Sequence, residues 1–396
     1  MHDRASRELA RQWDGRDPLA RFRKQFYRPA GQIYLDGGSL GLCSQEAERA
    51  LLRLLGDWKT KASAAFLDSS ASWSALPARL ATRLAYLLGA TPNEIAIGGS
   101  TGPHLQQLLA TLYRRQFHRP CILLDAFSSH REAIESHLAL RGLGAEAQLI
   151  TIDPARDRLL DEAKLEAALA DPNVQMAILP TVVSATGQLL DVARLCRVAR
   201  HSGTLIGLDL SHSLGVMPHA LDEWGADFAI WNHERFSGAG PGAAAGFYLS
   251  SRHFHLEPQI GEPPNDRSAR GAMKLQLGPP PILSLALLDG ALRPLEEAGV
   301  ERTHAKSLDL VHFLRAAIEG EIPSLRFATP REATRRGGHL AVIHPEAQRI
   351  CQLLQANGVT ADFREPDIIC LAPAPLYNSF VECWDAVQIL RRVLPA

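Results

Sequence analysis

Short apolar segments that alternate with amphipathic ones constrain the fold of this chain more than any other feature. Five apolar segments have the length and composition of buried strands: residues 121–124, 148–152, 176–179, 204–209 and 228–231. Between them, stretches such as residues 163–170 and 192–201 have the apolar spacing of helices. Buried strands that alternate with helices form a mainly parallel sheet with both faces covered. The sequence therefore predicts an α/β fold for this part of the chain.

The pattern changes after the three prolines at 279–281. The expected elements are helices at 282–297, 302–318, 345–357 and 379–394, and strands at 338–343 and 367–371. This arrangement indicates a second, smaller α+β domain that the N-terminus joins. We expect a large domain over residues 45–285 and a small one built from residues 1–44 and 286–396.

Polar residues follow two of the predicted strands. The segment from Asp209 to His212 comes at the end of one strand, and residues 126–130 follow another. Ligands in open parallel sheets bind beyond the carboxyl ends of the strands. We therefore expect the functional site at this edge of the sheet.

Composition excludes some partners. The 396 residues carry 42 basic and 43 acidic side chains, for a formal net charge of −1, without a long run of one sign. Neither nucleic acid nor an anionic membrane is favoured, and no segment reaches the ~18 apolar residues of a membrane span. The six cysteines form no Cys-x-x-Cys pair, and the N-terminus has no apolar export core. We expect a cytoplasmic protein with reduced thiols and a small-molecule partner.

Several motifs, in the same order along the chain, resemble those of one family. They are residues 34–42 (YLDGGSLGL), 126–130 (AFSSH), 133–136 (AIES), 186–188 (TGQ), 207–212 (GLDLSH), 222–228 (DEWGADF), 227–242 (DFAIWNHERFSGAGPG) and 372–380 (APAPLYNSF). Together they resemble the kynureninases, pyridoxal-phosphate (PLP) enzymes of fold type I, similar to class V aminotransferases. In the first motif, Gly38 replaces an asparagine. The resemblance implies a mostly parallel seven-stranded sheet with a smaller α+β C-terminal domain, and a homodimer whose pocket forms between two subunits.

Some site residues of the family are kept. The resemblance implies that Phe127 stacks on the pyridine ring and that Asp209 pairs with the ring nitrogen. His212 is kept three residues after Asp209. Thr101 matches a phosphate-binding threonine in a loop that opens a helix, a suitable place for an anion.

Five other site residues of the family are replaced. Arg235 stands in place of the Schiff-base lysine, and Glu234 in place of a tyrosine that helps to hold the phosphate. His130 replaces an aspartate of the pocket. Cys370 stands where the family has an arginine for the substrate's α-carboxylate, and Pro279 lies near an asparagine that reads the substrate. Five changes in one pocket indicate a repurposed or retired site.

The replacement at position 235 decides the expected cofactor chemistry. A Schiff base needs an amine that can lose its proton, and a guanidinium stays protonated. The chain has only six lysines, and none lies between residues 165 and 273. We therefore expect no covalently attached cofactor, and we expect PLP to be unlikely.

The pocket residues allow several roles. Asp209 can orient His212 or His130 as a base, or these residues are relics held by hydrogen bonds. Arg235 can bind a ligand's carboxylate or phosphate, or it pairs internally with Asp209 or Glu234. His233 could join the other histidines and Asp209 as a metal ligand, although their spacing is no more specific than chance.

Two further side chains, Ser211 and Cys370, could in principle act as nucleophiles. Neither lies in a recognisable nucleophile motif. An unactivated hydroxyl or a buried thiol is inert, so structural filling is the favoured interpretation for both.

Three functions fit these residues. The first is a PLP-independent enzyme of hydrolase or lyase type that acts by acid–base chemistry. Its substrate would be a small carboxylated compound, with an aromatic amino-acid derivative as the candidate, in amino-acid or specialised metabolism. The second is a catalytically dead pseudoenzyme that binds a ligand or a partner protein. The third is a kynureninase-type enzyme that holds PLP or pyridoxamine phosphate non-covalently. We expect the first.

Overall fold

The computed structural model describes residues 5–67, 72–113, 121–123, 128–144, 148–260 and 270–394. Its larger sheet has seven strands in the order β2-β8-β7-β6-β5-β3-β4. The strands are β2 (Ile95–Ile97), β3 (Cys121–Leu123), β4 (Leu149–Thr151), β5 (Met176–Pro180), β6 (Leu205–Asp209), β7 (Phe228–Trp231) and β8 (Gly246–Leu249). Those from β4 to β7 pair in parallel, whereas β8 pairs antiparallel with β7 and β2. The predicted seven-stranded, mostly parallel sheet is confirmed.

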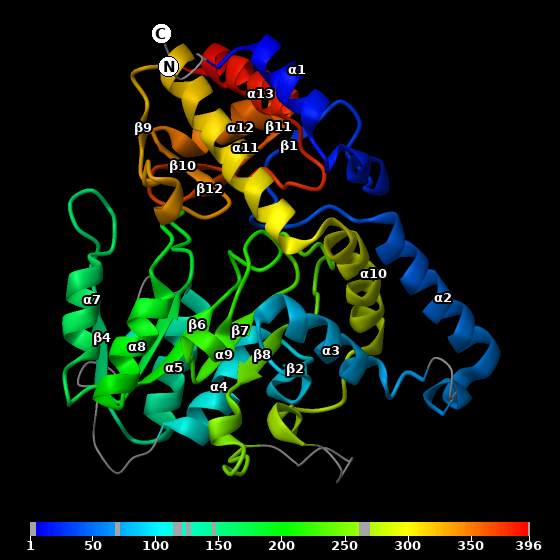
Figure 1. The fold of residues 1–396 in the computed structure, drawn as a ribbon, viewed down its shortest axis with the longest axis vertical. Helices are drawn as coiled ribbons and strands as arrows, with labels where there is room; N and C mark the ends of the chain where they lie inside the picture. The colour runs from blue at the N-terminus through cyan, green and yellow to red at the C-terminus, as the bar shows by residue number, and fades with distance from the viewer. Residues whose placement is uncertain are drawn as a thin grey trace.

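Helices cover both faces of this sheet (Figure 1). They are α2 (Gln45–Lys61), α3 (Leu76–Leu88), α4 (Thr101–Leu112), α5 (Ser128–Leu140), α7 (Glu162–Leu169), α8 (Val192–Ser202), α9 (Leu221–Trp224) and α10 (Ile282–Ala298). Alternate residues of a strand point to opposite faces. In β5, Ala177 and Leu179 accordingly join the core under α3, α7, α8 and α10, while Met176 and Ile178 join the core under α4 and α5.

The smaller unit combines helices with two short sheets. Its elements are α1 (Arg7–Arg16), β1 (Ile33–Tyr34), α11 (Val300–Glu321), β9 (Arg326–Phe327), β10 (Leu340–Ile343), α12 (Ala347–Ala356), β11 (Val359–Thr360), β12 (Asp362–Arg364), β13 (Ile368–Leu371) and α13 (Phe380–Val393). One sheet is antiparallel with the order β12-β13-β10-β9, and the other pairs β1 with β11 in parallel. Short 3-10 helices lie at Ala20–Gln25, Ala62–Phe66, Pro92–Glu94, Ser251–His253, Gly271–Leu275 and Ala333–Arg335.

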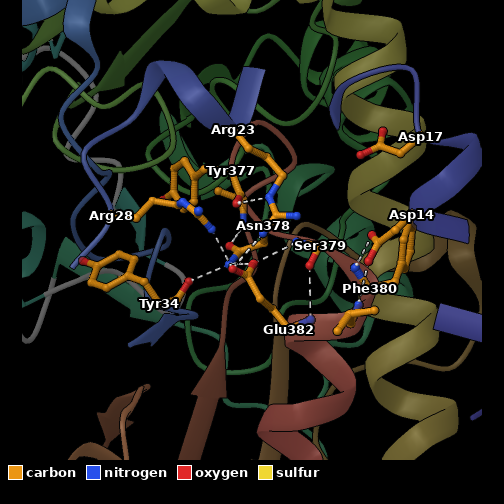
Figure 2. Close-up of polar contacts among 12 residues, drawn as sticks. Asp14, Asp17, Arg23, Arg28, Tyr34, Tyr377, Asn378, Ser379, Phe380 and Glu382 are labelled. Carbon is orange, nitrogen blue, oxygen red and sulfur yellow. Dashed lines mark hydrogen bonds and ion pairs between the residues drawn. The ribbon is translucent and has the colours of Figure 1, made fainter. Parts of the chain in front are cut away.

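The N-terminal segment is fastened to the C-terminal motif by polar contacts (Figure 2). Asp14 accepts hydrogen bonds from the first backbone amides of α13, at Phe380 and Val381. These amides have no partner inside the helix, so a carboxylate there is stabilising. Asn378 donates to the Tyr34 carbonyl at 2.9 Å, and Glu382 accepts from Arg23, Arg28 and the Ser379 amide. The motif at 372–380 thus holds the chain's beginning in place.

These contacts agree with the expectation that residues 1–44 belong to the small domain, which stays a proposal. The predicted boundary at residue 285 falls inside α10. The buried leucines of that helix, such as Leu288 and Leu292, belong to the core of the large unit. We propose that the break lies at Gly299, between α10 and α11.

Among the residues that the structure describes, no helix is both long and apolar enough to cross a membrane.

Candidate functional site

The site begins at the carboxyl end of β6, where the sequence analysis placed it. Asp209 is the last residue of this strand, and its side chain is buried. One carboxylate oxygen accepts a hydrogen bond from the Ser211 amide at 2.8 Å, and the other lies 3.5 Å from Nδ1 of His130. His130, on α5, is also buried. The carboxylate therefore contacts His130, one of the two histidines that Asp209 was expected to orient, whereas the spacing in sequence had pointed to His212.

His212 is buried beside a second imidazole that the sequence analysis did not include. Its ring centroid lies 5.8 Å from that of His339, the residue before β10. Burial lowers the pKa of His212 well below 6.5, and the nearby Arg235 and Arg364 guanidiniums lower it further. His212 is therefore neutral at pH 7, and it can serve as a hydrogen-bond partner or a transient proton acceptor rather than as an acid.

Arg235 faces the N-terminal segment from the loop after β7. Its Nη1 donates to the Gly38 carbonyl at 2.5 Å. Burial lowers the pKa of the guanidinium and Asp209 opposes this shift, yet arginine stays charged at any pH that the fold survives.

The two acids proposed as internal partners of Arg235 both act on its guanidinium by charge, and each also has a contact of its own. Asp209 pairs with His130. Glu234 accepts a hydrogen bond from the Gly242 amide at 2.8 Å through its side chain, and its carbonyl accepts from Gly41 at 2.7 Å. Glu234 thus fastens the glycine-rich loop and the N-terminal segment, and the Gly38 carbonyl is one of the groups that hold the Arg235 guanidinium.

Arg364 is the main charged residue that the sequence analysis missed. It lies on β12, and its side chain is 15% exposed. Nε donates to Asp362 at 2.9 Å, and Nη1 donates to the Ser184 carbonyl, which also accepts from Nε2 of His339 at 3.0 Å. The signal available in the sequence was an Asp and an Arg two residues apart, which share one face of a strand.

An anion-binding geometry occurs at the start of α4. Thr101 is the first residue of this helix, after Gly98, Gly99 and Ser100. Gly99 has a φ of +50°, a left-handed conformation that favours glycine. The Ser100 side chain makes no capping hydrogen bond, so the first amides of the helix are available to an anion. Phe127, the expected stacking residue, lies outside the described residues.

The remaining predicted site residues have structural surroundings. His233 is buried and accepts a hydrogen bond from the Trp231 indole at 2.9 Å, and burial lowers its pKa to about 3. Cys370 is buried on β13, and burial raises the pKa of its thiol to about 12, so it is not a nucleophile at neutral pH. Ser211 is buried in the loop after Asp209, and Pro279 is exposed. No group of three potential metal ligands occurs within the described part of the chain.

These residues fit PLP in part. Asp209 suits the ring nitrogen because it is a buried carboxylate with one oxygen beside His130, and the start of α4 suits a phosphate. The covalent contact does not fit, because Arg235 offers no amine that can lose its proton.

Comparisons with known proteins agree on one family. A family model described as the kynureninase C-terminal domain matches residues 303–390. The kynureninase of Geobacillus thermodenitrificans is 39% identical over 98% of this chain and 94% of its own length. That of Bacillus anthracis is 38% identical with the same coverage.

Solved structures show the same fold. Apo cysteine desulfurase from Thermococcus onnurineus aligns with a TM-score of 0.80 at 17% identity, over 94% of this chain and 97% of that one. A C-DES mutant with glycine covalently linked to its PLP cofactor aligns with a TM-score of 0.78 at 18% identity, over 93% and 98% of the two chains.

The expectation that PLP is unlikely is wrong. Relatives that match this chain over nearly its whole length are kynureninases, the C-DES structure carries PLP, and both point to PLP as the cofactor. The error had a physical origin: it took the lysine as the main holder of the cofactor. A carboxylate such as Asp209 and the amides at the start of α4 could contact the cofactor without that lysine.

Proposed function

The chain belongs to the kynureninase family, and from that premise we propose that it is an enzyme that holds PLP without a covalent bond and acts on a small carboxylated, amino-acid-derived substrate. The observation that carries the proposal is the buried pair of Asp209 and His130 at the end of β6. A buried carboxylate costs free energy unless it is paired. The chain keeps this buried pair although Arg235 has replaced the attachment lysine, which supports a role for the pair in binding the cofactor.

We assign separate roles in cofactor binding and proton transfer to the side chains of the site. Asp209 would accept a hydrogen bond from the ring nitrogen, His130 would steady that carboxylate, and the amides at the start of α4, with Thr101, would hold the phosphate. When bound, PLP supplies an electron sink for bonds at the α-carbon of an amino acid. His212, kept neutral by burial and two arginines, would receive or return a proton at the substrate.

We expect PLP to bind this protein reversibly. In the Asp209→Asn variant, the dissociation constant for PLP should be at least tenfold larger. A charge-assisted hydrogen bond contributes about 2 kcal/mol, which is a factor of about 30 in affinity. The measurement is an absorbance titration with PLP, followed by borohydride treatment and peptide mass analysis, in which no residue of the site should retain the cofactor.

Asp222→Asn, a change on α9 away from the pocket, is the matched control and should bind PLP as the wild type does. Failure of the wild type to bind PLP would contradict the proposal. Turnover of a carboxylated aromatic amino acid without PLP would then support the cofactor-independent acid–base enzyme, and the absence of both would support a ligand-binding pseudoenzyme.

We further propose a homodimer, as the family resemblance implies. The arm formed by α2 and the segment after it supports this, because Leu52, Trp58, Phe66 and Leu67 are between 44 and 85% exposed. Large apolar side chains that gather on a surface mark interaction sites.

Light scattering at micromolar concentration should give twice the 43.3 kDa chain mass, and the Leu52→Glu/Trp58→Glu variant should shift the mass towards the monomer. A monomeric wild type would rule the dimer out.

A further inference from the structure

We propose that a cavity beside α8 and α9 is a second binding site, which takes a small, uncharged aromatic molecule. The cavity has a volume of about 560 Å³, which is in the range of small-molecule sites. Its walls come from the large unit and from the 3-10 helix Ala333–Arg335 of the small unit. This site goes beyond the proposed function, and binding to it needs no cofactor.

The cavity and the site around Asp209 lie toward opposite faces of the large sheet. The helices α8 and α9 line the cavity, and their buried leucines belong to the core on one face. The helices α4 and α5, which carry Thr101 and His130, pack into the core on the other face. A ligand in the cavity would therefore contact different side chains from those assigned to PLP.

Three buried polar side chains form one wall of the cavity and are held by the sheet. The Ser213 hydroxyl lies 2.7 Å from that of Thr181 and 2.8 Å from Nε2 of His219. The Thr181 amide donates to the Asp209 carbonyl at 3.0 Å, which anchors this row to β6. Burial lowers the pKa of His219 to about 4, so the wall is uncharged at neutral pH. A wall fixed in this way loses little entropy when a ligand binds.

The other walls favour an aromatic ring. Two aromatic side chains adjoin there, since the ring centroids of His219 and Trp224 lie 6.0 Å apart with an angle of 62° between the ring planes. Aromatic rings pack well at such inclined angles, and the flexible thioether of a methionine also makes favourable contacts with a ring. The apolar side chains of these walls are Leu189, Leu190, Val192, Met217 and Trp224.

The charged groups of the cavity already have partners of opposite charge or hydrogen bonds of their own. Glu162 lies 3.5 Å from the Arg335 guanidinium and accepts a hydrogen bond from the Asp191 amide at 2.9 Å. The Asp191 carboxylate accepts from the Arg194 amide, and the Arg194 guanidinium lies 2.7 Å from Glu166. An ionic ligand would have to break one of these contacts or remain without a counter-charge, and either costs free energy. The cavity therefore favours an uncharged ligand.

The test compares three ligands with the same indole ring: tryptophol, which is neutral, indole-3-acetate, which is an anion, and tryptamine, which is a cation. Calorimetry on the full-length protein at pH 7.5 should show that tryptophol binds with a dissociation constant of about 1 mM or less, at least tenfold more tightly than either ion. Ala193→Trp, on α8, fills the cavity and should abolish tryptophol binding. Ala167→Trp adds the same ring at an exposed position of α7, outside the cavity, and is the matched control that should keep the affinity.

Folding of the variants is checked by circular dichroism, and Ala193→Phe takes the place of Ala193→Trp if the larger ring unfolds the protein. A crystal structure with tryptophol should show the ring beside Trp224 and Met217. Three outcomes would overturn the second site: no tryptophol binding by the wild type, equal affinity for the three ligands, or undiminished binding when position 193 carries the larger side chain. Tryptophol density beside Asp209 instead would assign the binding to the other site. None of these measurements uses PLP, so failure of the proposed function and failure of this site are separate results.

Discussion

The free energy of unfolding is expected to fall steeply as the pH drops from 6.5 towards 4. Six buried histidines are responsible: the pKa is lowered to about 4 for His104, His137 and His219, to about 3 for His233 and His339, and well below 6.5 for His212. Burial is the main cause in each case, because it disfavours the charged imidazole. All six histidines are at most 8% exposed.

The sign follows from the protons bound by each state. Below pH 6.5 these histidines are protonated in the unfolded chain (normal pKa about 6.5) and neutral in the folded one, so the unfolded state gains protons and stability falls. Each histidine contributes about 1.4 kcal/mol per pH unit between its unfolded and folded pKa values. Asp36 and Asp309 oppose this with two groups, because burial raises their pKa values and the folded state therefore takes up these two protons before the unfolded state does as the pH falls.

A net excess of four groups gives about 5 kcal/mol per pH unit, which exceeds a third of the stability of most domains. Unfolding by urea at pH 8, 7, 6 and 5 should therefore show a nearly constant midpoint above pH 7 and a rapid decline below 6. His104 packs edge-on against Phe247 at 4.9 Å, and His104→Leu should lower the slope by about one quarter.

Replacement of the exposed His255 by asparagine serves as the control and should leave the slope unchanged. A urea midpoint that is the same at pH 7 and pH 5 would show that the buried histidines take up protons in the folded state.

The parallel sheet could be predicted because its strands are buried on both faces and therefore appear as continuous apolar runs. Of this sheet, β2 (Ile95–Ile97) and β8 (Gly246–Leu249) were not predicted; they have three and four residues and pair antiparallel at one side of the sheet. Segments this short resemble parts of loops. The close approach of Gly207 to the Phe228 ring is likewise a property of the packed sheet and not of the sequence pattern.

The site could be predicted where it depends on neighbours in sequence. Asp209 and His212 follow one strand, and both are buried at its end. Arg364 and His339 could not be placed in this way, because the small unit brings them to the pocket from more than 120 residues farther along the chain. The direction of the Glu234 side chain could not be predicted either, because it is set by a hydrogen bond from the Gly242 amide after the turn.

The second large effect is expected from one buried ion pair, between Lys306 and Asp17. Their charged atoms lie 2.6 Å apart, and the two side chains are 5% and 3% exposed. Lys306→Met should reduce the free energy of unfolding by about 3–5 kcal/mol, because it leaves the Asp17 carboxylate buried without its counter-charge. Melting temperature should fall by roughly 5–10 °C.

This ion pair also matters for the site. Lys306 lies on α11 and Asp17 directly after α1, so the pair fastens the N-terminal segment that continues to Gly38 and its contact with Arg235. In Lys306→Met, the N-terminal segment should consequently be cleaved earlier in limited proteolysis, and kynurenine should bind more weakly than to the wild type. Loss of stability and loss of binding should appear together.

Two further variants separate charge burial from packing. Lys306→Met/Asp17→Asn removes both charges and keeps an acceptor for the Leu19 amide, so it should recover most of the lost stability. Lys274→Met, which removes a looser pair with the exposed Glu257 at 3.4 Å, should cost less than about 1 kcal/mol. A double variant as unstable as Lys306→Met would mean that the lysine stem, and not its charge, holds the N-terminal segment against the rest of the molecule.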